Sequence, residues 1–116
     1  MKYKIVYIKD DYIDIMTYYP HFVEWVYKMP TDSYNAKQIE ILFEPIQMGK
    51  QQLLKIFETR DDYQYYHGVH MLNNSLTHEV IKIKMNEYDI EVEESHQKHD
   101  IYNILRAISH NFYIII

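Results

Sequence analysis

A short polar segment holds the residues of this chain that could most readily bind a metal ion. His96 and His99 lie three residues apart, and they would converge if the segment formed a helical turn. Glu93 or Asp100 could then supply a third ligand, since imidazole and carboxylate groups both bind zinc. No third ligand is assured by the spacing, so we predict no metal and no cofactor.

No established catalytic signature can be assembled from the rest of the chain. With only Gly49 and Gly68 available, neither common glycine-rich phosphate loop can be formed. No serine lies in a nucleophile elbow, and the chain has no cysteine. His67 and His70 lie on a predicted strand, where residues three apart point to opposite faces. The adjacent carboxylates fit helix caps and solvated turns better than acid–base catalysis. They are Asp10–Asp11, Asp61–Asp62 and Glu93–Glu94. We therefore predict no catalytic residues.

Composition favours one small globular domain. The chain has 116 residues, of which 47% are hydrophobic, enough for a single core. Its net charge of −5 and its scattered basic residues argue against direct nucleic-acid binding. The absence of cysteine suits a reducing cytoplasm. The N-terminal residues do not resemble a signal peptide, and no apolar run is long enough to span a membrane. We expect a cytoplasmic protein with a single domain over residues 1–116; its oligomeric state is open.

The first half of the chain is predicted to be mainly helical. Tyr3 to Ile8 is apolar on both faces, as in an inner strand. Helices are expected from Tyr12, over His21 to Lys28, from Asn35, and over Lys50 to Glu58. Prolines and one glycine separate them; these residues are Pro20, Pro30, Pro45 and Gly49.

The second half is predicted to be mainly strands. The expected strands are Tyr63–Leu72, Leu76–Met85 and Tyr88–Glu94, followed by a helix over Asp100 to Ser109. The closing run Phe112 to Ile116 is apolar on both faces, which predicts a central strand. The order β-α-α-α-β-β-β-α-β indicates an α/β (mixed α+β) fold. Its mixed, mainly antiparallel sheet of about five strands would carry packed helices.

Ile41 does not fit the amphipathic pattern of its helix. The core stripe has helical spacing and consists of Ile39, Leu42, Phe43 and Ile46. Ile41 lies on the opposite side, where water is expected, and Gln38 lies one turn earlier on that side. Lys37 and Glu44 flank the pair. An uncharged centre with charges at its rim is typical of a protein interface.

Three segments resemble the SirA family, the sporulation inhibitors of replication. The run KQIEILFEPI is similar to that family's lysine-glutamine-isoleucine helix. The opening KIVYIKDDYIDIM resembles its first strand, acidic pair and aromatic-led helix. The end DIYNILRAISHNFYIII resembles its terminal helix and strand. The likeness covers nearly the whole chain as short matches in order.

The resemblance implies a protein without enzymatic activity that binds the N-terminal domain of the replication initiator DnaA. By occupying that domain, it would prevent productive assembly at the origin. The implied contact residues are Tyr12 and Met16 on the first helix, with Gln38 and Ile41 on the later one. Met16 and Ile41 stand where a family member carries tyrosines, which preserves apolar area and removes hydroxyl groups.

The residues themselves leave alternatives open. Tyr12, Ile15, Met16 and Tyr19 have the spacing of a helical stripe, so Tyr12 and Met16 could belong to the core. The interface could also serve a different partner. A third possibility is a small enzyme or ligand-binding domain that uses the tyrosine- and histidine-rich sheet near Tyr65 and His67.

Overall fold

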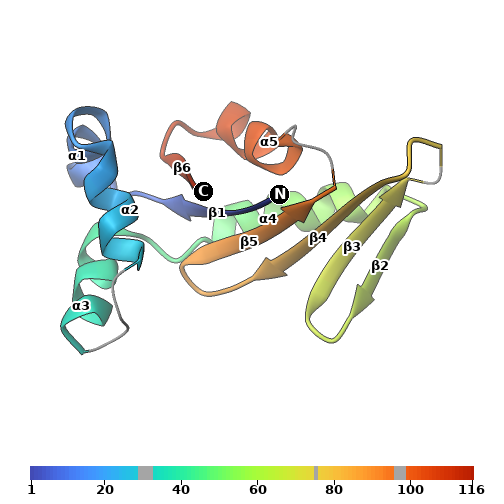
Figure 1. Cartoon of the computed structure of the whole chain (residues 1–116), viewed down its shortest axis with the longest axis horizontal. Helices are drawn as coiled ribbons and strands as arrows, with labels where there is room; N and C mark the ends of the chain where they lie inside the picture. The colour runs from blue at the N-terminus through green and yellow to red at the C-terminus, as the bar shows by residue number, and fades with distance from the viewer. Residues whose placement is uncertain (29–32, 75, 96–98) are drawn as a thin grey trace.

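The computed structural model describes residues 1–28, 33–74, 76–95 and 99–116, and within them the chain forms one six-stranded sheet (Figure 1). The strand order is β2-β3-β4-β5-β1-β6, and every neighbouring pair is antiparallel. The strands are β1 (Lys2–Tyr7), β2 (Tyr63–Tyr66), β3 (Val69–Asn74), β4 (Glu79–Met85), β5 (Asp89–Glu94) and β6 (Phe112–Ile115). A 3₁₀ turn, η1 (Asp10–Tyr12), follows β1. The helices are α1 (Ile13–Tyr18), α2 (Pro20–Lys28), α3 (Ser33–Leu42), α4 (Gln47–Glu58) and α5 (Asp100–Ile108).

Two helices, α4 and α5, supply the core on one face of the sheet. Tyr3 and Ile5 of β1 point to this face, because alternate residues of a strand share a side. They pack in one cluster with Leu53 of α4 and Leu105 of α5. Both leucines are fully buried, so these helices are fixed to the sheet by apolar packing.

The opposite face is covered at one end by α1, α2 and α3, which gather beyond the end of β1 (Figure 1). Val6 and Ile8 point to this face and join a second buried cluster with Val23, Val26 and Phe43. Farther along the same face, strands β1, β4 and β5 carry charged side chains instead. The second face is therefore divided between a helix-covered end and an open, polar part.

The predicted α+β class is confirmed, but the expected number of strands was too low. The stretch predicted as one strand over Tyr63 to Leu72 folds as the hairpin β2–β3. His67 and Gly68 have φ angles of 49° and 78°, and consecutive positive φ values suit a two-residue hairpin turn. The sheet thus has six strands where about five were expected. Four α-helices lie between β1 and β2, which matches the four helical segments expected there, although the predicted element order had only three.

The last strand was predicted to be central, and this was wrong. β6 lies at the edge of the sheet, paired only with β1 in the described part of the chain. Its two apolar faces are explained by helices on both sides. Phe112 belongs to the cluster with α4 and α5, and Ile115 belongs to the cluster with α2. Burial on both faces therefore did not require a strand neighbour on both edges.

Gly49 was expected to separate two helices, but it lies inside the first turn of α4, which begins at Gln47. A Cβ atom at this position would lie 3.1 Å from Cε1 of Phe112 and 3.2 Å from Cγ1 of Ile46. Glycine lets α4 pass close to the start of β6, since a larger residue here would require these neighbours to shift by a few tenths of an ångström. Its role is close packing and not helix termination.

Candidate protein-binding surface

The two sides of α3 differ as the sequence pattern predicted. Leu42, Phe43 and Ile46 are buried, while Ile41 is 46% exposed. The helix ends at Leu42, so the buried stripe continues past the helix: Phe43 forms an isolated antiparallel bridge with Ile8. Ile41 is thus an exposed apolar residue beside a firmly anchored point of the chain.

Lys9 holds the end of α3 against the end of β1. Its backbone N–H donates to the carbonyl oxygen of Leu42 at 3.0 Å, and its Nζ donates to the carbonyl oxygen of Glu40 at 2.7 Å. The Lys9 carbonyl in turn accepts a hydrogen bond from the N–H of Tyr12 at 2.9 Å. The first two bonds use carbonyl groups that the end of α3 leaves without intrahelical partners. They bring the start of the η1–α1 segment next to the end of α3 that carries Ile41.

The four residues implied as partner contacts lie in different surroundings. Gln38 is half-buried and lies one turn before Ile41, so the two side chains share a side of α3. Tyr12 lies in η1, is half-buried and packs against the second core cluster. Met16 lies in α1, and its side chain is outside the described part of the structure. The structure therefore places Gln38 and Ile41 together and gives Tyr12 a packing contact.

Three more aromatic side chains are exposed on the same group of helices. The sequence placed Tyr19 in a possible core stripe and did not single out the other two. Tyr18 and Tyr19 lie at the end of α1, and Trp25 on α2 is 58% exposed. The pattern that identified Ile41 also applies to Trp25, which is an apolar residue lying off the buried stripe of its helix. Val23 and Val26 are buried and Phe22 packs against their cluster, while Trp25 falls off that stripe. The Trp25 and Phe22 rings lie 6.0 Å apart between centroids. Tryptophan and tyrosine are enriched at energetically important interface positions.

The described residues contain no group of three histidines or carboxylates placed to hold a metal ion. The predicted candidate depended on His96, which lies outside the described residues. His99 is half-buried, and its ring packs edge-on against Tyr3 at 5.3 Å. This contact accounts for His99 as part of the packing beside α5.

In the tyrosine- and histidine-rich hairpin, Tyr63 and His70 pack against α4, whereas Tyr65 and His67 are exposed. The phenolic oxygen of Tyr63 and Nδ1 of His70 are hydrogen-bonded at 2.6 Å, and both rings stack near Phe57 of α4. Burial lowers the pKa of His70 and raises the pKa of Tyr63. Both shifts favour the neutral forms. A cavity of about 440 Å³ lies elsewhere, over β4, β5 and β1.

No family model and no curated protein matches the sequence. Within the described residues, the helices are too short or too polar to cross a bilayer.

Proposed function

We propose that this protein inhibits DNA replication initiation by binding the N-terminal domain of the initiator DnaA in the cytoplasm. The proposal rests on the resemblance of its sequence to the SirA family. The observation that carries it is the exposure of Ile41 on α3, within the segment that resembles the family's contact helix. An isoleucine 46% exposed beside buried Leu42 gains from burial against a partner.

The proposed mechanism is occlusion, without catalysis and without a cofactor. Ile41 and Gln38 would form the centre of the contact, and Tyr12 and Met16 would extend it along the first helix. Lys9 fixes the end of α3 to the η1–α1 segment, so little conformational entropy is lost on binding. Such a preorganised surface competes with assembly contacts on the same initiator domain.

A second candidate function is binding of a different partner through the same group of helices. The exposed Tyr18, Tyr19 and Trp25 favour it, because the family resemblance assigns them no role. A partner that buries Trp25 would gain a large apolar contact area.

Calorimetric titration of the full chain against the isolated N-terminal domain of DnaA tests the proposal. We expect saturable binding that Ile41→Glu weakens and that Lys55→Gln, a change at an exposed site on α4, leaves unchanged. Absence of heat and of any spectral shift at high micromolar concentration would refute initiator binding. Binding that is lost with Trp25→Ala and unaffected by Ile41→Glu would favour the second candidate.

A further inference from the structure

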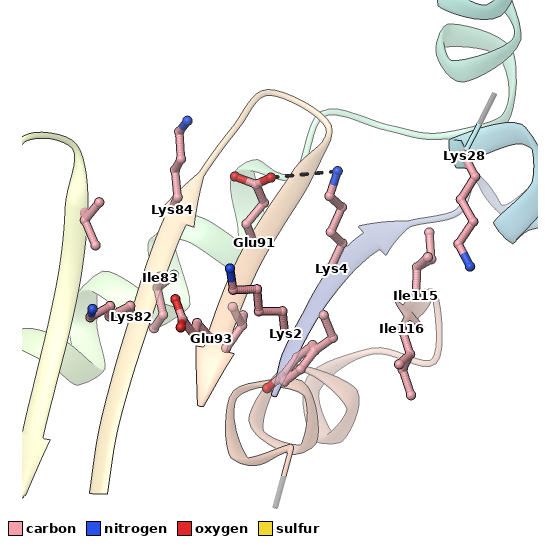
Figure 2. A pocket seen from close by; sticks show the side chains of 13 residues that line it. Lys2, Lys4, Lys28, Lys82, Ile83, Lys84, Glu91, Glu93, Ile115 and Ile116 are labelled. Atoms are coloured by element: carbon pink, nitrogen blue, oxygen red, sulfur yellow. Dashed lines mark ion pairs between the residues drawn. The ribbon is translucent and has the colours of Figure 1, made fainter. Parts of the chain in front are cut away.

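The open part of the second sheet face is hollowed into a basic depression, which we call the lysine trough. Five lysines line it: Lys2 and Lys4 of β1, Lys82 and Lys84 of β4, and Lys28 at the end of α2. Figure 2 shows Lys28 across the cavity from the two lysines of β4. The volume of the trough is about 440 Å³, which is within the range of ligand-binding pockets.

Strand register gives the trough a regular charge pattern. On β5, Glu93 lies between Lys2 and Lys82, and Glu91 lies between Lys4 and Lys84. Nζ of Lys4 lies 3.7 Å from Oε1 of Glu91 (Figure 2). Five lysine side chains against two glutamate side chains leave a net side-chain charge of +3. Ion pairs between lysines and glutamates within the trough therefore cannot neutralise its positive charge.

This concentration of positive charge is unexpected in an acidic protein. The whole chain carries −5, so the residues outside the trough carry −8. The basic residues are scattered in the sequence, yet the fold brings five of the twelve to one depression. At physiological ionic strength charges are screened beyond about 8 Å, so a bound anion responds mainly to the local +3.

The trough also offers apolar contacts. Ile115 and Ile116 line it beside Lys28, and the aliphatic stems of the lysines add further apolar surface. Ile116 is 66% exposed. A complementary occupant therefore combines several negative charges with small apolar groups.

We propose that the lysine trough binds an extended acidic segment of a partner protein. The lysine rows of β4 and β1 are two strand spacings apart, or about 10 Å, and Lys28 lies beyond them. One compact anion cannot contact charges so far apart, whereas a peptide with carboxylates at intervals can. A nucleic-acid backbone carries a charge at every phosphate, so it would place phosphates against Glu91 and Glu93 in the middle of the trough. The trough contains none of the four residues proposed to contact the initiator, so this inference is independent of the proposed function.

The test uses the full chain and a fluorescein-labelled decapeptide of alternating glutamate and alanine, with fluorescence anisotropy as the readout. We expect saturable binding at low salt and no binding of the matching uncharged glutamine–alanine peptide. Lys82→Gln with Lys84→Gln should weaken binding by about five- to thirtyfold, as expected for two exposed charge contacts. The matched control, Lys37→Gln with Lys55→Gln, removes the same charge from exposed positions outside the trough and should change affinity by less than about twofold.

Glu93→Gln should change the affinity for the peptide in the opposite direction. This exposed substitution raises the net charge of the trough, so it should tighten peptide binding by about two- to fivefold. Circular dichroism and thermal melting should show that all these surface variants fold like the parent. Ile41→Glu should leave peptide binding unchanged, which separates failure of this inference from failure of the proposed function.

Four results would overturn the inference. One is the absence of peptide binding at millimolar concentration, and another is equal weakening by the two lysine pairs. A third is displacement of the peptide by equimolar inorganic tripolyphosphate, which would identify a site for compact anions. The fourth is tighter binding of a ten-nucleotide thymidine strand through the same lysines, which would identify a nucleic-acid site.

Discussion

Ile41 and Leu42 are consecutive residues that face different surroundings at the end of α3: Ile41 is 46% exposed and Leu42 is 6% exposed. Leu42 packs in the second core cluster with Val6 and Phe43. The adjacent side chains thus belong to different environments, one solvated and one apolar.

Substitutions at these two positions should have different effects. Ile41→Glu should change the free energy of unfolding by no more than about 0.5 kcal/mol, since the side chain faces water. It should cost at least about 1–2 kcal/mol of binding to the initiator domain, because a carboxylate would be desolvated at an apolar contact. Leu42→Ala should destabilise the fold by about 2–5 kcal/mol. Chemical denaturation and calorimetry measure both effects. Equal destabilisation by the two changes would place Ile41 in the core and refute the proposed contact.

Initiator binding should depend only modestly on salt. Its proposed centre is apolar and amide-bearing, and charges at a rim act mainly on the association rate. Raising sodium chloride from about 50 to 200 mM should therefore weaken binding by less than about threefold. A dissociation constant that rises steeply over this range would show that Lys37 and Glu44 carry the interface.

The hydroxyl of Tyr3 should stabilise the fold through Glu94. Both residues are buried, and the hydroxyl donates to Oε1 of Glu94 at 2.7 Å. The N–H of Ile101 also donates to this oxygen, at 3.4 Å. Burial, together with the Glu94 carboxyl, raises the pKa of Tyr3. Tyr3→Phe leaves a buried carboxyl with one weak donor and should cost about 1–3 kcal/mol in urea denaturation. Tyr66→Phe, at an exposed position, is the control; equal costs would contradict this role.

Position 49 should tolerate a larger side chain poorly, because little space surrounds Gly49. Gly49→Val would push side-chain atoms against the fully buried ring of Phe112. We expect destabilisation by about 1–3 kcal/mol. Gln51→Val adds a β-branched residue at an exposed position of the same helix and should cost less than about 1 kcal/mol. Similar melting temperatures for the two variants would show that the α4–β6 contact is looser than the structure indicates.

His70 should make stability fall in mild acid. Burial lowers its pKa in the folded state, while the unfolded chain takes up a proton near about 6.5. The unfolded state therefore binds more protons just below this pH, and the free energy of unfolding falls as the pH decreases through the depressed folded pKa. His70→Gln should flatten this dependence between about pH 7.5 and 5. A nuclear magnetic resonance titration giving His70 a pKa above the unfolded value would contradict the prediction.

Local patterning was sufficient to predict much of the fold. Helical spacing identified the buried side of α3, and alternation on β5 separated buried Ile90 and Val92 from Glu91 and Glu93. These signals are local because one side of an element must leave water whatever it packs against. The off-stripe position of Ile41 followed from the same reasoning, and its exposure is confirmed. Its role in binding stays a prediction.

Other features were decided only by tertiary structure. β6 is apolar on both faces because helices cover it from both sides, and its sequence reads the same as that of a central strand. The sequence indicated that Gly49 breaks a helix, whereas the structure shows that it packs closely against Phe112. The lysines of the trough are far apart along the chain and meet only through the pairing of β4, β5 and β1. Sequence determined which side of each element is buried, because that depends on local periodicity. Tertiary structure decided which surfaces meet, because that depends on long-range packing and strand order.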